Sequence, residues 1–216
     1  MKILIILILF TLTACQETVD EPSATQTEAK KPKYFIILAL GDSLTEGLGV
    51  DEKDNYPSKL QKLLPTNFKV INAGLSGETS SGLKNRLDWV LSQKPNLTIL
   101  NIGANDAMRG LPLELTTNNI DGIITRIKQA DSDVILAGMQ IYNNLGKEYV
   151  TGFKEIYPKL AKKHNIPLIP FFLAHVAGKP ELNQADMLHP NAKGYEIIVK
   201  KNILPIINQY LNSKEL

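Results

Sequence analysis

Short apolar runs alternate along the chain with longer segments whose apolar residues recur at the spacing of an amphipathic helix. Strands that alternate with helices in this way favour parallel pairing with crossover helices. The pattern therefore predicts one three-layer α/β/α domain around a mostly parallel five-stranded sheet. The expected strands are 33–40, 68–73, 97–102, 134–139 and 167–172, and the expected helices are 56–64, 82–93, 113–130, 147–164 and 193–211.

Several residues refine these helices. Pro57 suits the first turn of its helix, whereas Pro158 is expected to kink the fourth helix and Pro205 to bend the last one. Trp89 is expected in the core, because it falls among the apolar residues of segment 82–93. No internal repeat or second domain is visible.

The first 33 residues differ in composition from the rest. Residues 1–15 combine a positive start, a short apolar run and a small-residue ending, as a bacterial lipoprotein signal with its lipobox does. Cys15, the only cysteine, would then carry lipid; a plain signal peptide with an incidental cysteine is the alternative. Residues 16–33 lack large apolar side chains and predict a flexible tether, so the folded domain is expected over 34–216.

The overall composition is that of an ordinary globular protein. The 216 residues carry a formal net charge of only +2, which favours neither a nucleic acid nor an acidic polymer. The apolar fraction of 44% is enough for one good-sized core.

A serine follows the first expected strand, in Gly41-Asp42-Ser43. Ligands of open α/β sheets bind at the carboxyl ends of strands, so Ser43 is a candidate nucleophile. Two alternatives remain open. Ser43 and Glu46 have the spacing of a helix capping box, and the glycines at 47 and 49 could belong to a phosphate-binding loop.

The other strand ends supply the remaining parts of an acyl-transfer site. Gly77 can present a backbone N–H to an oxyanion, and Asn105 can add a side-chain N–H. His189 can act as base, and Asp186 is close enough in sequence to orient it. Taken singly, Gly77 could be a turn glycine and Asn105 a helix N-cap.

The three histidines can be ranked by their neighbours. His164 ends a helix, where a solvated charge is favourable, and His175 has no acid within a turn. Only His189 combines a nearby acid with a loop position after the last strand.

These blocks together resemble the SGNH hydrolases of the GDSL family, in particular the bacterial secreted branch of thioesterases, lysophospholipases and arylesterases. The matching residues are Gly41-Asp42-Ser43-Leu44, Gly77, Gly103-x-Asn105-Asp106 and Asp186-x-x-His189. One position departs from the branch, since Ala104 stands where a second glycine is common. The resemblance extends from Tyr34 to about Gln209 and excludes the α/β-hydrolases, whose nucleophile elbow needs a glycine where Thr45 stands.

The resemblance implies a flavodoxin-like sheet and hydrolysis of carboxylic esters and thioesters without metal or cofactor. It implies a Ser43-His189-Asp186 triad and an oxyanion hole made by Ser43, Gly77 and Asn105. The expected partners are a small acyl ester, thioester or lysophospholipid and, through a lipidated N-terminus, a bacterial membrane facing the periplasm or the cell exterior.

The position of apolar residues on loops near the site suggests an acyl-chain surface, formed by Met108, Leu111, Ile141 and Leu188. Two rival functions remain. One is a carbohydrate O-acetylesterase or O-acyltransferase with the same triad, and the other is a non-enzymatic flavodoxin-like binding module.

Overall fold

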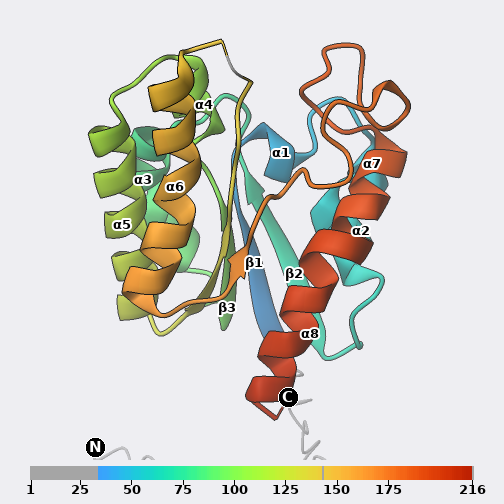
Figure 1. The fold of residues 1–216 in the computed structure, drawn as a ribbon. Helices are drawn as coiled ribbons and strands as arrows, with labels where there is room; N and C mark the ends of the chain where they lie inside the picture. Colours follow the sequence, from blue (N-terminus) through green and yellow to red (C-terminus); the bar gives the residue numbers. More distant parts are fainter. Residues whose placement is uncertain (1–33, 143, 216) are drawn as a thin grey trace, which may run out of the picture. The chain divides into compact units, whose positions relative to one another are not determined.

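The computed structural model describes residues 34–142 and 144–215, and these form a parallel sheet with helices on both faces (Figure 1). The strand order is β2-β1-β3-β4-β5, and every neighbouring pair is parallel. This order confirms the predicted flavodoxin-like α/β architecture. The strands are β1 (Phe35–Gly41), β2 (Phe68–Gly74), β3 (Leu97–Asn101), β4 (Asp133–Ala137) and β5 (Leu168–Ile169). The predicted signal segment 1–15 and tether 16–33 lie outside the described residues.

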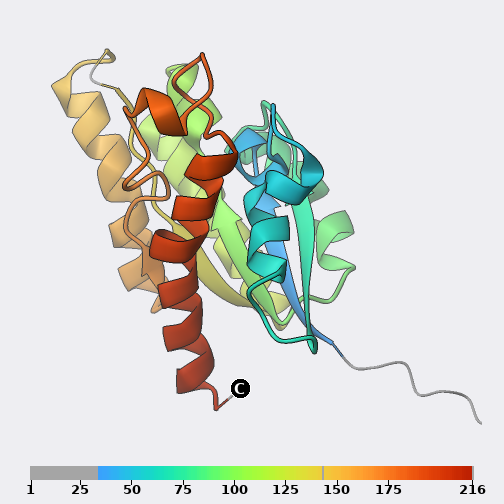
Figure 2. The same cartoon turned by 90° about the vertical axis from the view of Figure 1, so that its right-hand side faces the viewer.

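The helices divide between the two faces of the sheet, as Figures 1 and 2 show. Helices α3, α5 and α6 cover one face, and α2, α7 and α8 cover the other. Two short helices, α1 and α4, lie at the carboxyl edge of the sheet, directly after β1 and β3. The bounds are α1 (Ser43–Glu46), α2 (Tyr56–Gln61), α3 (Ser80–Leu91), α4 (Ala104–Met108), α5 (Leu113–Gln129), α6 (Lys147–His164), α7 (Ala192–Ile197) and α8 (Leu204–Ser213).

The inner strands form the centre of the core. Ile37, Leu38, Ala39 and Leu40 of β1 have no exposed surface, because helices cover both of their faces. Burying each of the larger side chains contributes about 1.5–3 kcal/mol relative to leaving it in water. The strand that precedes Ser43 is therefore held rigidly.

Two proline-containing segments differ from the sequence prediction. The last strand was expected over 167–172, but β5 contains only Leu168 and Ile169. Pro167 and Pro170 flank it and have no N–H to extend the ladder. The last helix consists of α7, a π-helical segment (Ile198–Ile203) and α8, so the change in hydrogen bonding comes just before Pro205. Helix α6 has the predicted bounds and continues through Pro158.

The placement of Trp89 in the core was wrong, because this residue is 73% exposed. The buried face of α3 is formed by Leu83, Leu87, Val90 and Leu91, which recur at helical spacing. Trp89 lies off that face, so its apolar character misled the prediction.

Gly41 generates a prediction about stability. A Cβ at Gly41 would collide with the carbonyl oxygen of Asn101 and the hydroxyl of Thr45. We expect Gly41→Ala to lower the free energy of unfolding by about 1–3 kcal/mol, the usual cost of overpacking a dense interior. Urea denaturation measures this change.

Gly122→Ala is the matched control. This glycine lies inside α5, and an added Cβ would come no closer than 3.9 Å to Lys84. We expect this variant to be more stable by about 0.5–1 kcal/mol. Equal responses of the two variants would show that the close approach at Gly41 does not matter.

Candidate active site

Ser43 is the first residue of the short helix that follows β1, and only 8% of it is exposed. Asp42 is the N-cap of this helix, because its side chain accepts a hydrogen bond from the N–H of Leu44 at 3.0 Å. The capping-box alternative for Ser43 is therefore wrong. The carboxylate of Glu46 instead accepts from the backbone N–H of Ser76 at 2.8 Å.

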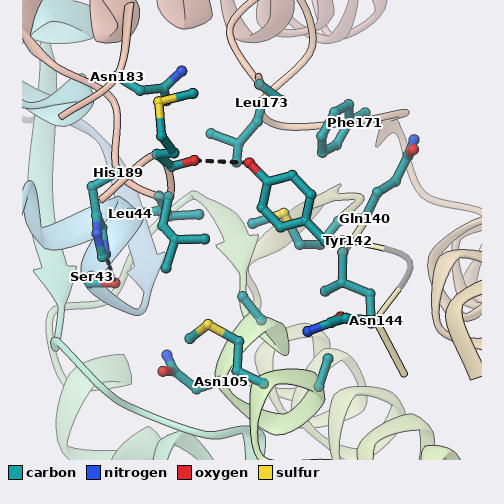
Figure 3. Close-up of a pocket in the computed structure, with 18 of the residues that line it drawn as sticks. Ser43, Leu44, Asn105, Gln140, Tyr142, Asn144, Phe171, Leu173, Asn183 and His189 are labelled. Carbon is teal, nitrogen blue, oxygen red and sulfur yellow. Dashed lines mark hydrogen bonds between the residues drawn. The ribbon is translucent and has the colours of Figure 1, made fainter. Parts of the chain in front are cut away.

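His189 links the nucleophile candidate to an acid (Figure 3 shows Ser43 and His189). The hydroxyl oxygen of Ser43 lies 2.8 Å from Nε2 of His189, and Nδ1 of the same ring lies 2.6 Å from Oδ2 of Asp186. A carboxylate accepts but does not donate, so Nδ1 carries the proton and Nε2 is free to accept from the Ser43 O–H. The structure thus joins the three residues predicted from sequence.

Asp186 also closes the turn that carries the histidine. Its Oδ1 accepts the backbone N–H groups of Leu188 at 2.9 Å and His189 at 3.0 Å. Partial burial opposes the charged carboxylate, but the hydrogen bonds from His189 and Leu188 outweigh it and lower the pKa of Asp186 to about 2. Asp186 therefore both caps a turn and orients the imidazole.

The remaining two histidines lie outside this hydrogen-bonded path. Nε2 of His164 lies 2.7 Å from a carboxylate oxygen of Asp121, and the His164 side chain is only 11% exposed. The expectation of a solvated charge at that helix end was therefore wrong. His175 adopts a left-handed backbone with a φ of 68°.

Asn105 lies within α4 and is held by the loop between β2 and α3. Its Nδ2 donates to the carbonyl of Glu78 at 3.0 Å, which leaves the second N–H of the amide for a ligand. The residue that precedes α4 as its N-cap is Gly103, so the N-cap alternative for Asn105 is wrong. Asp106 fixes α4 to α3, since its two carboxylate oxygens accept from the backbone N–H and hydroxyl of Ser80 at 2.8 and 2.5 Å.

Gly77 occupies a turn in that same loop, with a φ of 76°. Its carbonyl accepts from the guanidinium of Arg109 at 2.8 Å. Within residues 34–142 and 144–215, no hydrogen-bond acceptor is found for its N–H. Gly77 is next in sequence to Glu78, whose carbonyl accepts from Asn105. It lines a surface depression with Thr79 and Arg109 and does not line the cavity that contains Ser43.

A cavity of about 540 Å³ extends from Ser43, Asn105 and His189 (Figure 3). Of the predicted acyl-chain residues, Met108, Ile141 and Leu188 line it, and Leu111 does not. The carbonyl of Leu111 instead accepts from the hydroxyl of Tyr149 at 2.6 Å. Sequence reasoning missed other lining residues that come from four separate segments: Leu44, Met139, Tyr142, Phe171, Leu173 and Met187.

Within the part of the chain that the structure describes, no three His, Cys, Asp or Glu side chains gather into a group that could hold a metal ion. The helices of this part include none with the length and apolar character needed to cross a membrane.

Comparison with known proteins gives consistent matches. Residues 39–197 match the model of the GDSL-like lipase/acylhydrolase family. An arylesterase of Vibrio mimicus is 39% identical over 71% of this chain and 79% of its own length. The thioesterase 1/protease 1/lysophospholipase L1 of Escherichia coli K12 is 34% identical over 80% of this chain and 85% of its own length.

A solved structure supports the same relationship. The psychrotrophic esterase EstA from a Pseudoalteromonas species, inhibited by monoethylphosphonate, is similar with a TM-score of 0.78 and 32% identity. The similarity covers 82% of this chain and 99% of that one.

Asp42, next to Ser43, has an unusual environment. It is 1% exposed, and among the described residues its Oδ2 has no hydrogen-bond partner. Burial raises the pKa of Asp42 to about 7; the N–H of Leu44 opposes this shift, and the carboxylates of Glu78 and Asp106 add to it. The folded protein therefore holds a proton on Asp42 at pH values where the unfolded chain, with a pKa of about 3.9, has released it.

The stability contributed by this proton is lost as the pH rises from about 4 through 7. Asp42→Asn removes the titration but keeps a side chain that can cap α1. We therefore expect the free energy of unfolding of the variant, relative to wild type, to increase steadily between pH 4.5 and 7.5. Urea denaturation at several pH values measures it, and a difference that stays constant with pH would contradict the buried, protonated carboxyl.

Proposed function

Because the chain belongs to the GDSL-like lipase/acylhydrolase family and is a serine ester hydrolase, we propose that Ser43, His189 and Asp186 are its catalytic triad. The observation that carries this proposal is the continuous path of hydrogen bonds, 2.8 Å from Ser43 to His189 and 2.6 Å from His189 to Asp186. Each contact joins a donor to an acceptor in the order that nucleophilic catalysis needs.

In the first half of the reaction, Nε2 of His189 takes the hydroxyl proton as Oγ of Ser43 attacks the acyl carbonyl carbon. The tetrahedral intermediate collapses, the bond to the leaving group breaks, and His189 gives the proton to the departing oxygen or sulfur. In the second half, water attacks the acyl-enzyme with His189 again as base. Asp186 keeps the imidazole in the required tautomer and stabilises its charged form.

We propose that the backbone N–H groups of Ser43 and Gly77 and the side chain of Asn105 hold the oxyanion. The hydrogen bond from Asn105 to the Glu78 carbonyl supports this role, because it fixes the amide before substrate arrives. The backbone of Gly77 supports it too, since its N–H has no hydrogen-bond acceptor among the described residues and no side chain stands beside it. The mechanism uses no metal ion, organic cofactor or nucleic acid.

The acyl group of the substrate is proposed to lie in the cavity beside Ser43, against Met108, Ile141 and Leu188. The names of the relatives suggest aryl esters, acyl thioesters and lysophospholipids as substrates. Carbohydrate O-acetyl esters are the competing class, and hydrolysis of acetylated xylan in preference to p-nitrophenyl esters would favour them.

We further propose that residues 1–15 direct export and that Cys15 is lipidated, with residues 16–33 as a tether to the domain of 34–216. The composition of these segments supports this proposal. The enzyme would then be anchored by lipid to a bacterial membrane and face the periplasm or the cell exterior.

The test of the triad is covalent labelling. A fluorophosphonate probe should add to Ser43, and Ser43→Ala should abolish both labelling and hydrolysis of p-nitrophenyl butyrate, since the hydroxyl that contacts the base is then missing. Ser92→Ala is the control, because this exposed serine donates only to the Trp89 carbonyl on α3. Peptide mass spectrometry locates the label, and an active Ser43→Ala protein would overturn the proposal.

The test of the anchor is mass spectrometry of the mature protein. Wild type expressed in a Gram-negative host should carry acyl chains on Cys15 and sediment with membranes, because more than one chain gives stable anchoring. Cys15→Ser should lack the added mass, whether it is processed at another site or stays unprocessed. A wild-type N-terminus without acyl chains would contradict the lipobox interpretation.

A further inference from the structure

One hydrogen bond crosses the cavity beside the nucleophile. Tyr142 belongs to the segment between β4 and α6, and its hydroxyl donates to the carbonyl of Met187 at 3.0 Å. Met187 lies between Asp186 and His189, in the segment that carries the base. Figure 3 shows the ring of Tyr142 extending toward that segment, with the dashed line at its hydroxyl.

This contact is the only hydrogen bond found between residues 138–142 or 144–146 and residues 183–190. Both segments line the cavity, so this one hydrogen bond joins its two walls. The contact between the Tyr142 hydroxyl and the Met187 carbonyl is called the bridge below. Met187, which accepts this bond, has a left-handed backbone conformation with a φ of 60°. The position of the bridge is therefore set by the same turn that presents His189.

The bridge is also accessible. Tyr142 is 56% exposed as a residue, although it lines an apolar cavity together with Phe171 and Leu173. A tyrosine of this kind can remain in place over a short ligand or rotate outward when a longer one needs the space. Its ring supplies apolar surface in either case.

We propose that Tyr142 is a specificity-determining residue that limits the length of the acyl chain by bridging the cavity to Met187. This inference rests on the proposed acyl-enzyme mechanism at Ser43. A short acyl chain occupies the space between Ser43 and the bridge, whereas a long chain has to displace the hydroxyl from the Met187 carbonyl.

Two opposing contributions to binding make the limit on chain length gradual: the lost hydrogen bond and the newly buried methylenes. Breaking one intramolecular hydrogen bond of this kind weakens binding by about two- to tenfold. Each methylene that becomes buried strengthens it by about fourfold. A few methylenes beyond the bridge therefore offset its loss, so long-chain esters are hydrolysed with a penalty and are not excluded.

The experiment compares kcat/KM for p-nitrophenyl laurate with that for p-nitrophenyl butyrate. In Tyr142→Phe, which keeps the ring and removes the hydroxyl, the laurate-to-butyrate ratio should rise by about two- to tenfold, mainly through a lower KM for laurate. Tyr142→Ala, which removes the ring as well, should also raise the ratio. The ratio is informative because a general structural defect would lower both rates together.

Tyr149→Phe is the matched control. Tyr149 also donates its hydroxyl to a backbone carbonyl, that of Leu111 at 2.6 Å, but it does not line the cavity. Its removal should leave the laurate-to-butyrate ratio unchanged.

Wild-type hydrolysis and labelling of Ser43 are measured first in the same preparation. A failure of the acyl-enzyme mechanism is then distinguished from a failure of the role proposed for Tyr142. In an active enzyme, an unchanged or lower ratio in Tyr142→Phe would overturn the role of Tyr142. An equal rise in Tyr149→Phe would overturn it as well, because the effect would then not belong to the bridge.

Discussion

Parallel pairing of β1 with both β2 and β3 is the constraint on which the site depends. In this pairing Gly41 is opposite Gly74 on one side and opposite Asn101 on the other, so three strands end at the same level. Ser43, Gly77 and Asn105 each follow one of these ends within a few residues. The backbone can approach this closely only because Gly41 and Gly74 have no Cβ: a side chain at either would meet neighbouring backbone atoms. The positions of the nucleophile and of the proposed oxyanion donors therefore follow from the register of the three strands.

The base arrives by a different route. His189 is not at a strand end but in a turn before α7. Hydrogen bonds of Gln184 hold this turn against the loop that follows α1. The side-chain amide of Gln184 donates to the carbonyls of Leu48 at 2.7 Å and Pro190 at 3.0 Å, and its backbone N–H donates to the carbonyl of His189 at 2.8 Å. This arrangement brings together residues far apart in the sequence and leaves one side of the cavity dependent on loop contacts. Tyr142 bridges that side.

Much of this could be predicted from sequence because the signals were local and periodic. The inner strands, the amphipathic faces of α5 and α6, and the Asp186–His189 pair are each readable within one segment. The errors came where contacts between segments decide. Trp89 is apolar but lies off the buried face of its helix, Leu111 is near the site in sequence but outside the cavity, and β5 ends early between two prolines. Tyr142 could not be assigned from sequence, because its partner is a backbone carbonyl in a distant turn.

Ser43 and His189 are expected to act as one catalytic unit, which can be tested by measuring kcat for Ser43→Ala, His189→Ala and the double variant. If the proton on Ser43 passes to His189 across their 2.8 Å contact, each single variant should lose several orders of magnitude in kcat, and the double variant should be little worse than either. Losses that multiply in the double variant, or a His189→Ala enzyme that keeps most of its activity, would show that the two residues do not act as one unit.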